Sequence, residues 1–338
     1  MTKPTAVRTA VMGSLAAVLM AALAVVPGRA GQAAPSAAPP PPARVQSLKI
    51  QILSTMLADD GLGEWGFAAM VEVDGKRILF DTGARPSTVL ENARELKVDL
   101  AGVPEVILSH NHADHTGGLL TLRKDVQGRD GKALARVHVG RGLFWSRPTQ
   151  DGAGESNLPL RTRGQYEAAG IAFVEHDGPQ QILPGVWLTG PVPRVHPERN
   201  WSGRGRVRAP DGLVEDTVPE DQSLVFDTDR GLVILSGCGH AGVVNTVEYA
   251  RKVVRAAPVH ALVGGFHLFN LDDERLGWTA DQLKRSGLEN LLGAHCTGIE
   301  AVYRIRERAG LARKSCVVGS VGSSFVLGPG IDPRDLAR

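Results

Sequence analysis

The sequence is short of cysteine, of aromatic residues and of net charge, and each shortage excludes a class of protein. Three cysteines in 338 residues are too few for a scaffold held by disulfides. A formal net charge of +2 is too small to favour a nucleic-acid partner. Only one long apolar run is present, which excludes a membrane protein with several spans. Aromatic residues make up 5% of the chain, whereas 40 glycines and 21 prolines favour a fold rich in turns.

The single long apolar run lies near the start of the chain, over residues 10–26. Lys3 and Arg8 precede it and small residues follow it, as in a secretory signal peptide. We therefore predict a signal peptide over residues 1–34, a Pro/Ala-rich linker over residues 35–44, and export to the periplasm or the medium. An uncleaved anchor helix is the alternative. Apart from this segment we expect no contact with a membrane.

Strands and helices are predicted to alternate through one domain, residues 45–330. Strands are expected at 47–53, 68–73, 77–80, 106–108, 224–226, 232–235, 260–263, near Leu291, at 317–318 and at 324–327. Helices are expected at 87–96, at 244–254 and in a segment that ends at Leu283. Asp74-Gly75 between two apolar strands is a strong signal for a hairpin turn. Strand hairpins followed by alternating strands and helices indicate a layered α/β sandwich.

The candidate chemistry is concentrated in one short segment that directly follows an apolar strand. Its sequence, H-N-H-A-D-H, places four potential metal ligands within six positions, namely His110, His112, Asp114 and His115. His110 and His112 alternate on one side of an extended turn and can hold one ion, whereas Asp114 and His115 point toward a second. Imidazole together with one carboxylate favours Zn²⁺, with Fe and Mn as alternatives.

The H-x-H-x-D-H segment resembles the hallmark of the metallo-β-lactamase superfamily, and the likeness extends over most of residues 45–327. More narrowly, the chain resembles the branch of dihydropterin-ribofuranosylaminobenzene 5'-phosphate synthases. That likeness is carried by FDTG at 80–83, SGCGHAG at 236–242, GGFHL at 264–268 and HCTG at 295–298. The resemblance implies a four-layer αβ/βα sandwich. It also implies that His240 and His295 face the metals, with His295 at the second ion.

Three further residues are candidates for the site. Asp81 is expected to orient a histidine of the loop. Cys238 occupies the place where many members of the superfamily carry an aspartate that bridges two ions. It can bind zinc as a thiolate, be a small buried residue, or form a disulfide with Cys296 that leaves Cys316 free. His267 can donate a proton to a leaving group or contact an anion, with a packed histidine as the alternative.

The segment 140–220 is less regular and rich in arginine, with Arg141, Arg147, Arg194, Arg199, Arg204, Arg206 and Arg208. Together with the interspersed Phe144, Trp145 and Trp201, these arginines can bind an anionic, ring-bearing substrate by ion pairing and stacking. A solvated charged surface is the alternative. Trp65 stands where members of the resembled branch often have a histidine, so it is expected to alter the pocket.

These features predict an exported metal-dependent hydrolase that acts on a small molecule. A pair of zinc ions, or one tight and one labile ion, would lower the pKa of a water molecule, which Asp114 would hold. The expected substrate is an ester, a lactone or a phosphoester, and the arginines favour the phosphoester because it is anionic. The alternatives are a pterin-type synthase, as in the resembled branch, and a metal-dependent binding protein without turnover.

Overall fold

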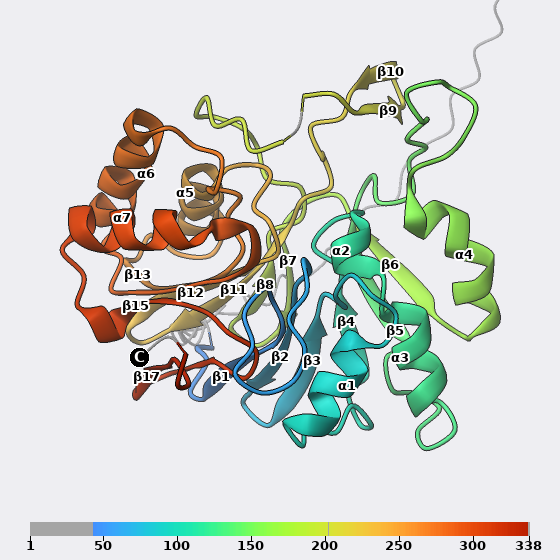
Figure 1. Ribbon diagram of the computed structural model, residues 1–338, viewed down its shortest axis with the longest axis horizontal. Coiled ribbons are helices and arrows are strands. Elements are labelled where there is room, and N and C mark those ends of the chain that lie inside the picture. Colours follow the sequence, from blue (N-terminus) through green and yellow to red (C-terminus); the bar gives the residue numbers. More distant parts are fainter. Residues whose placement is uncertain (1–42, 202, 337–338) are drawn as a thin grey trace, which may run out of the picture. The chain divides into compact units, whose positions relative to one another are not determined.

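Two β-sheets form the centre of the fold, and helices cover the outer face of each (Figure 1). The computed structural model describes residues 43–201 and 203–336. The predicted signal peptide and all but the end of the predicted linker therefore lie outside the described residues. No helix within the described ranges is long and apolar enough to cross a membrane.

The first sheet contains eight strands that come from both ends of the described chain. They are β1 (Leu48–Ser54), β2 (Ala68–Val73), β3 (Lys76–Phe80), β4 (Glu105–Ile107), β5 (Arg136–Gly140), β6 (Ala172–His176), β16 (Ser324–Val326) and β17 (Gly330–Asp332). In space their order is β17-β16-β1-β2-β3-β4-β5-β6. The strands β3 to β6 run parallel, whereas β1, β2, β16 and β17 are joined antiparallel.

The second sheet contains seven strands from the second half of the chain. They are β7 (Gln180–Leu183), β8 (Val186–Leu188), β11 (Ser223–Thr228), β12 (Gly231–Ser236), β13 (Val259–Gly264), β14 (Asn290–Gly293) and β15 (Cys316–Val318). In space their order is β15-β14-β13-β12-β11-β8-β7, and β12 to β15 run parallel. A separate small hairpin is formed by β9 (Arg206–Ala209) and β10 (Gly212–Glu215).

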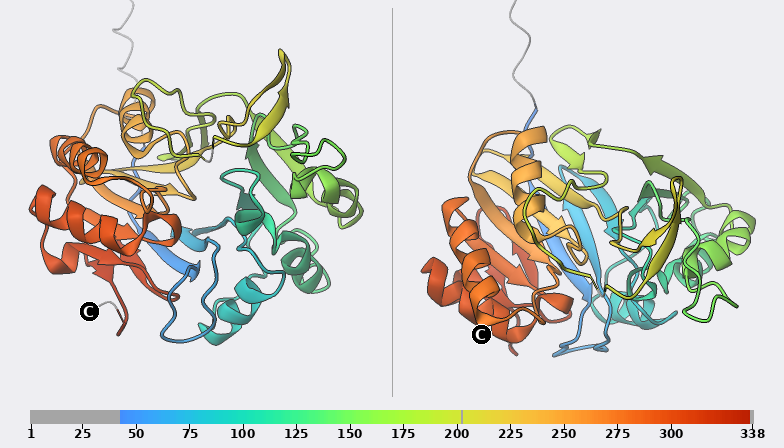
Figure 2. Two further views of the ribbon diagram at one scale, coloured as in Figure 1. Left: turned by 45° about the horizontal axis from the view of Figure 1, so that its top comes forward. Right: turned by 90° about the horizontal axis from the view of Figure 1, so that it is seen from above.

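Helices from the two parts of the chain cover opposite outer faces (Figures 1 and 2). The first sheet is covered by α1 (Thr88–Glu95), α2 (Ala113–Thr116), α3 (Leu119–Val126) and α4 (Leu158–Ala168). The second sheet is covered by α5 (Val243–Val253), α6 (Asp273–Arg285) and α7 (Ile299–Ala309). Two short 3₁₀ turns, η1 (His295–Thr297) and η2 (Arg313–Ser315), follow β14 and precede β15.

The central strands of both sheets are buried on both faces, and their alternating side chains enter two different cores. In β2, Ala69, Val71 and Val73 point into the core between the sheets, whereas Ala68 and Met70 point into the core beneath α1 and α3. A third core lies between the second sheet and α5 to α7. Three apolar cores separating four layers confirm the predicted α/β sandwich of the metallo-β-lactamase type.

Most of the predicted elements are present, with ends shifted by one or two residues. The hairpin between β2 and β3 turns at Asp74 and Gly75, whose φ values of 45° and 75° both lie in the left-handed region that such turns require. The segment 140–220, expected to be irregular, contains α4 and the strands β6 to β10. These elements escape prediction because little of their surface is buried: in α4 only Pro159 and Tyr166 are buried.

Parallel strands bring the loops that carry the candidate residues to one edge of each sheet. The carboxyl ends of β3 and β4 lie side by side in the first sheet, and those of β12, β13 and β14 lie side by side in the second. The carboxyl ends of parallel strands are where α/β sheets place their ligand-binding loops, so this edge is the expected place for the site. The loops concerned begin at residues 81, 108, 237, 265 and 294.

Candidate metal centre

The histidine loop leaves β4 in an extended conformation and closes with the single helical turn α2. His112 precedes that turn with ψ of 144°, so the chain is still extended there. Gly117 then allows the turn to lie against the β3 loop, because a Cβ at this position would be 2.0 Å from the carbonyl oxygen of Ala84. The glycine therefore permits a backbone approach that fixes how far the loop projects from the sheet.

Asp81 holds the histidine loop from the neighbouring strand. Its Oδ2 lies 2.7 Å from Nδ1 of His115, and its two oxygens accept hydrogen bonds from the backbone N–H and the hydroxyl of Ser109, each at 2.7 Å. With Nδ1 engaged, Nε2 of His115 is left to face the centre, 3.1 Å from Sγ of Cys238. This is the orienting contact predicted for Asp81.

Two groups of potential ligands meet where the loops of the two sheets converge. In each group, all ligand atoms lie within 4.8 Å of one another. The first group consists of His110, His112 and His240, and the second of Asp114, His115 and His295. Each group combines residues of the H-x-H-x-D-H loop with a histidine from the second sheet, and His110 and His115 also share a further group with Cys238.

The thiol of Cys238 lies between these two groups. It is within the same 4.8 Å limit of His110 and His115, of His240 and His267, and of His295 and Cys296. Cys238 therefore occupies a central place rather than a peripheral one. It is also unoxidised, as are Cys296 and Cys316, so the structure contains no disulfide among the described cysteines.

Buried ring nitrogens without partners show that these residues fit a metal ion. Nδ1 of His110 contacts the Ser109 hydroxyl at 2.9 Å, and Nδ1 of His240 contacts the carbonyl of Asn200. Nε2 of each of these histidines and Nδ1 of His295 are buried without a hydrogen-bond partner within the described residues. Buried polar atoms are seldom left unpaired, and a cation bound by these nitrogens would satisfy them.

Electrostatics in the first group favours neutral imidazole, which is the form that binds metals. Burial lowers the pKa of His110 and of His240 well below the usual histidine value. Burial also lowers the pKa of His112 to about 4. All three rings are therefore unprotonated near neutral pH, with lone pairs available to a cation.

The second group is an ionic one. Burial alone would raise the pKa of Asp114, but the neighbouring His115 and the hydrogen bond from His295 hold it well below its usual range. Burial opposes charge on His115, yet the carboxylates of Asp81 and Asp114 raise its pKa to about 9. The two carboxylates thus stabilise positive charge at this position, and a metal cation would supply it.

Three residues of the centre have an unusual backbone conformation. The φ values of Asp81, His267 and His295 are 55°, 49° and 47°, in the left-handed region that non-glycine residues seldom adopt. Such residues cost about 1–3 kcal/mol each and are found where function requires them. His267 is half-buried, its ring centroid is 4.6 Å from that of His240, and its Nδ1 has no partner among the described residues.

An exposed pair of aromatic rings borders the second group. Trp65 is 48% exposed and its ring centroid lies 4.9 Å from that of His295. Phe269 is 43% exposed, and its ring centroid lies 5.4 Å from that of Trp65 and 5.2 Å from that of His267. We refer to Trp65 and Phe269 as the aromatic rim. Trp65 was expected to alter the pocket, but Phe269 was not foreseen, because an isolated phenylalanine after GGFHL carries no signal.

The expectation that the arginines of segment 140–220 contact substrate is wrong for Arg147. This side chain is buried and donates to Asp216 and Glu220, each at 2.7 Å. Glu220 in turn accepts a hydrogen bond from the backbone N–H of Asn111 at 3.1 Å. Arg147 therefore supports the histidine loop indirectly, because it holds Glu220, which binds the backbone of Asn111. Sequence reasoning missed this network, because its members lie up to 109 residues apart.

Two other arginines flank an aromatic ring near the first group. Arg194 and Arg199 lie over the ring of Trp201, with distances of 5.2 and 5.3 Å from guanidinium carbon to ring centroid. Arg194 also donates to the carbonyl oxygen of His240 at 3.3 Å, which ties this cluster to the centre. His196, which the sequence did not implicate, bonds to Glu248 at 2.7 Å and belongs to no ligand group found among the described residues.

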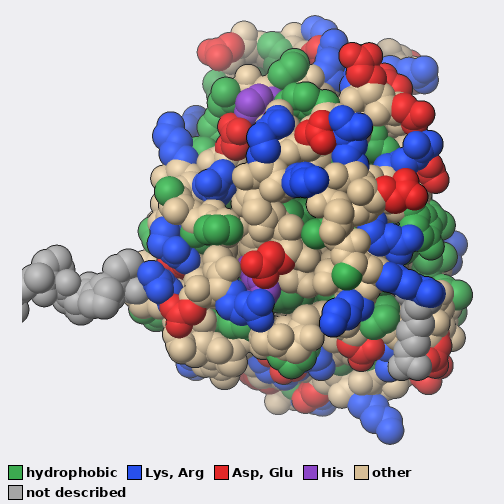
Figure 3. Space-filling model, turned by 90° about the vertical axis from the view of Figure 1, so that its left-hand side faces the viewer, with side chains coloured by type: hydrophobic (Ala, Val, Ile, Leu, Met, Phe, Trp, Pro, Cys, Tyr) green, Lys and Arg blue, Asp and Glu red, His purple; other side chains and the backbone are tan. Residues whose placement is uncertain are grey.

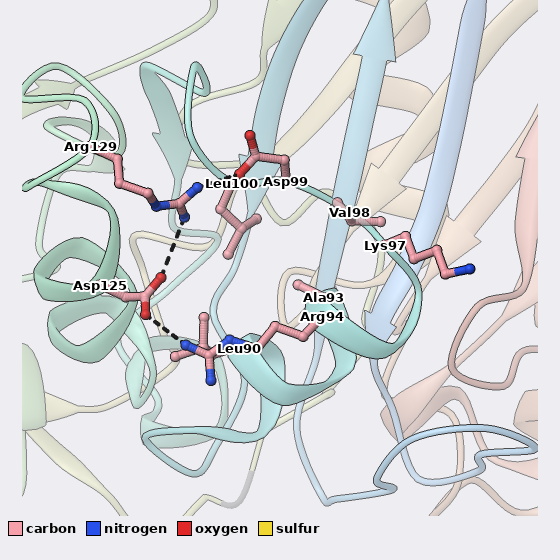
Figure 4. Close-up of a pocket in the computed structure, with 9 residues that line it drawn as sticks. All are labelled: Leu90, Ala93, Arg94, Lys97, Val98, Asp99, Leu100, Asp125 and Arg129. Atoms are coloured by element: carbon pink, nitrogen blue, oxygen red, sulfur yellow. Dashed lines mark hydrogen bonds and ion pairs between the residues drawn. The ribbon is translucent and has the colours of Figure 1, made fainter.

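A pocket between α1 and α3 is separate from these loops (Figure 4). Arg94 pairs with Asp125 at 2.8 Å, and Arg129 pairs with Asp99 at 3.0 Å and with Asp125 at 3.5 Å. Both arginines are thus engaged by carboxylates of the same pocket. We assign no function to it.

Comparisons with known proteins agree with this geometry. The family model described as the metallo-beta-lactamase superfamily matches residues 66–254. The 7,8-dihydropterin-6-methyl-4-(beta-D-ribofuranosyl)-aminobenzene-5'-phosphate synthase of Methanocaldococcus jannaschii is 31% identical over 269 residues, covering 76% of this chain and 90% of that protein. An uncharacterized protein of the same organism is 30% identical over 247 residues, covering 72% and 87%.

A solved structure shows the same arrangement of sheets and helices. Tm1679, described as a metal-dependent hydrolase of the beta-lactamase superfamily, superimposes with a TM-score of 0.64 and 26% identity. The match covers 82% of this chain and 98% of that one. The family model, the two relatives and the shared fold all lead to one assignment. The chain belongs to the metallo-β-lactamase superfamily.

Proposed function

We propose that this protein is a metal-dependent hydrolase of a small, anionic substrate. The observation that carries the proposal is the pair of ligand groups, in which buried histidine nitrogens of both sheets face one another without partners. His110, His112 and His240 would hold one ion. A second ion would be held by Asp114, His115 and His295, with Cys238 between them. Zinc is our first choice because imidazole and thiolate ligands suit it.

A bound zinc ion would supply Lewis-acid activation of water and of the scissile bond. The side chain of Asp114 is 21% exposed, so one of its oxygens can accept a proton from the attacking water. His267 is half-buried beside His240 and is free at Nδ1, which suits donation of a proton to the leaving group. Asp81 keeps the ring of His115 in a single orientation throughout.

The surroundings of the centre support an anionic substrate that carries a ring. The aromatic rim offers two exposed faces for stacking beside His295. On the side of His240, Arg194 and Arg199 flank Trp201; Arg194 supplies positive charge, whereas Arg199 pairs with Glu215 at 3.2 Å. A phosphoester combines both properties; esters and lactones use the same chemistry. The face at the left of Figure 1 mixes lysine and arginine with aspartate and glutamate, so it carries no broad patch of one charge (Figure 3).

A pterin-type synthase activity is the second candidate. It is favoured by the 31% identity to the named synthase of M. jannaschii, 90% of which is covered by this chain. The aromatic rim would suit a planar ring in this case as well. A binding protein without turnover is the third possibility, and the same experiment separates all three.

The test is the metal content of the purified protein, measured together with turnover of chromogenic esters, lactones and phosphoesters. We expect one to two zinc ions per chain and hydrolysis of at least one substrate class. His112→Ala should lower the metal content and abolish hydrolysis, because it removes a ligand of the first group. His196→Ala, which changes a histidine outside both groups, is the matched control and should change neither.

Full metal content and full activity in His112→Ala would refute the assignment of the first group. Bound metal without turnover on any substrate, including dihydropterins with a phosphorylated ribofuranose donor, would favour the binding protein. Turnover confined to the pterin substrates would favour the synthase.

A further inference from the structure

Two buried cysteines, Cys238 and Cys296, face each other at the edge of the second ligand group. Their sulfur atoms lie 3.2 Å apart, although the residues are 58 positions apart in the chain. Cys238 and Cys296 are 2% and 0% exposed. Cys296 was expected only as the partner of Cys238 in a disulfide. The metal centre described above makes no use of it.

The order of the strands explains how the two thiols meet. Cys238 follows β12, Cys296 follows β14, and β13 runs between them. The loop after β13 must therefore carry no side chain at the point where it separates the two cysteines. Gly265 provides this, since a Cβ there would lie 2.0 Å from the carbonyl oxygen of Gly237 and 3.0 Å from Sγ of Cys296.

Cys296 is held rigidly in this position. The hydroxyl of Thr297 donates to the carbonyl of Gly264 at 2.9 Å, which ties the turn η1 to the end of β13. The backbone N–H of His267 donates to Sγ of Cys296 at 3.3 Å. Backbone N–H donors to sulfur favour a negatively charged sulfur over a thiol. The turn thus presents the sulfur of Cys296 toward the centre in a fixed direction.

The thiol pair is adjacent to unpartnered ligands of the centre. Sγ of Cys238 lies 3.1 Å from Nε2 of His115, and ligand atoms of Cys238, Cys296 and His295 lie within 4.8 Å of one another. Nδ1 of His295 lacks a partner among the described residues, whereas Nε2 faces Asp114 at 3.3 Å. Two sulfurs and the ring of His295 therefore face a common volume, with His115 beside Cys238, and sulfur together with imidazole is a ligand set that suits zinc.

We propose that Cys296 is a second thiolate ligand of the metal centre, so that its sulfur and that of Cys238 join His295 around the second ion. This inference rests on the proposed metal centre and adds a ligand to it. Binding would release the two thiol protons to solvent, and each sulfur would donate an electron pair to the cation. Soft thiolates select zinc over manganese and magnesium, which prefer oxygen ligands, so the proposal also specifies the class of ion.

The test is cobalt substitution of the full chain, read by absorption spectroscopy. Sulfur-to-cobalt charge transfer gives a near-ultraviolet band that histidine and carboxylate ligands do not give. Cys296→Ser should lose about half of this band and bind the second ion at least ~10-fold more weakly. Cys316→Ser is the matched control: this cysteine is also buried, but its sulfur donates to the carbonyl of Val302, and the band should be unchanged.

Zinc-edge X-ray absorption of the unmutated protein provides a second measurement that needs no variant. Zinc–sulfur bonds of about 2.3 Å are distinct from zinc–nitrogen bonds of 2.0–2.1 Å. Sulfur bonds beyond those that one cysteine can supply support the proposal. The proposal would be overturned if Cys296→Ser kept the full sulfur-to-cobalt band of the unmutated protein. It would also be overturned if the metal-loaded chain had a mass two hydrogens below that of the reduced chain, because this indicates a Cys238–Cys296 disulfide. A parent that binds no metal would overturn the proposed function as well.

Discussion

Asp114 differs from the other candidate ligands because it is the only carboxylate in the H-x-H-x-D-H loop and is partly exposed. Its Oδ2 lies 3.3 Å from Nε2 of His295 and 3.8 Å from Nε2 of His115. Two histidines thus fix one oxygen of the carboxylate, while 21% of the side chain remains accessible. The same side chain can therefore bind an ion and accept a proton from water.

Asp114→Asn tests this double role. The amide keeps the size of the side chain and one acceptor oxygen but loses the charge and the ability to accept a proton. We expect kcat to fall at least ~10²-fold, the scale of lost acid–base assistance. Steady-state kinetics with metal content measured in the same samples is the appropriate assay. A variant as active as the parent would show that another group activates the water, and His267→Ala would then be the next variant.

The residues of the centre were predictable in proportion to how close they lie in sequence. His110, His112, Asp114 and His115 lie within six positions, so their pattern alone indicated metal ligands. His240 and His295 followed from the resemblance to a known family. The meeting of Cys238 with Cys296 depends on the order of three strands, which spacing does not reveal. The burial of Arg147 depends on acidic partners at distant positions, and its sequence context resembles that of a surface arginine.

At the level of elements, the site depends on how closely neighbouring loops can approach. The carbonyl of Gly237 would contact a Cβ at Gly265, while a Cβ at Gly237 itself would lie 2.1 Å from the Ser109 hydroxyl. Both glycines are thus required by space rather than by their φ angles. They allow the loop after β12 to contact the histidine loop on one side and the loop after β13 on the other.

Gly265→Ala should destabilise the protein and disturb the centre. The added methyl group meets a backbone carbonyl, which cannot rotate away as a side chain could. We expect a loss of about 1–3 kcal/mol in the free energy of unfolding, measured by urea denaturation. The control is Gly164→Ala in α4, where a Cβ meets nothing within 4 Å among the described residues. That change should add about 0.5–1 kcal/mol, because alanine is the better helix former.

Elements of the sandwich were predictable where strands are buried on both faces. The apolar runs of β2, β12 and β13 stand out because every second residue enters a different core. The helix α7 was not foreseen, although Ala301, Val302 and Ile305 form a buried face. Its three arginines and two glutamates obscure a buried stripe only three residues wide. Tertiary packing, and not local pattern, distinguishes such helices from charged loops.

At the scale of the whole described unit, the metal centre joins the two sheets. The H-x-H-x-D-H loop belongs to the first sheet, whereas Cys238, His240 and His295 follow strands of the second. Each ligand group includes residues from both sides. An ion bound there is therefore a cross-link between the halves of the sandwich, and its effect on stability extends beyond the loops.

Metal removal should lower the stability of both sheets together. A ligand that binds only the folded state at 100 times its dissociation constant adds about 2.7 kcal/mol to the free energy of unfolding. We expect added zinc to raise the melting temperature and a chelator to lower it, with a single transition by calorimetry in each case. Identical melting curves with zinc and with chelator would contradict the cross-link, and His112→Ala should remove most of the response to zinc.

We also propose that the chain acts outside the cytoplasm. The proposal rests on Lys3, Arg8, the apolar run at residues 10–26 and the small residues after it. Mass spectrometry of the protein from its native host should show a mature chain that lacks roughly the first 30 residues. A full-length cytoplasmic species as the main form would reject the proposal, and a full-length membrane-bound form would favour the anchor helix.

The left-handed backbone conformation of Asp81, His267 and His295 lowers the stability of the fold but places these residues in the proposed metal centre. Glycine would relax each position, and the strain relieved is about 1–2 kcal/mol per residue. At Asp81 this gain is offset by the loss of three buried hydrogen bonds, but heat-resistance screens that ignore activity would favour glycine at His267, which is half-buried. Engineering of a hardier variant should hold these positions constant and seek its gains elsewhere.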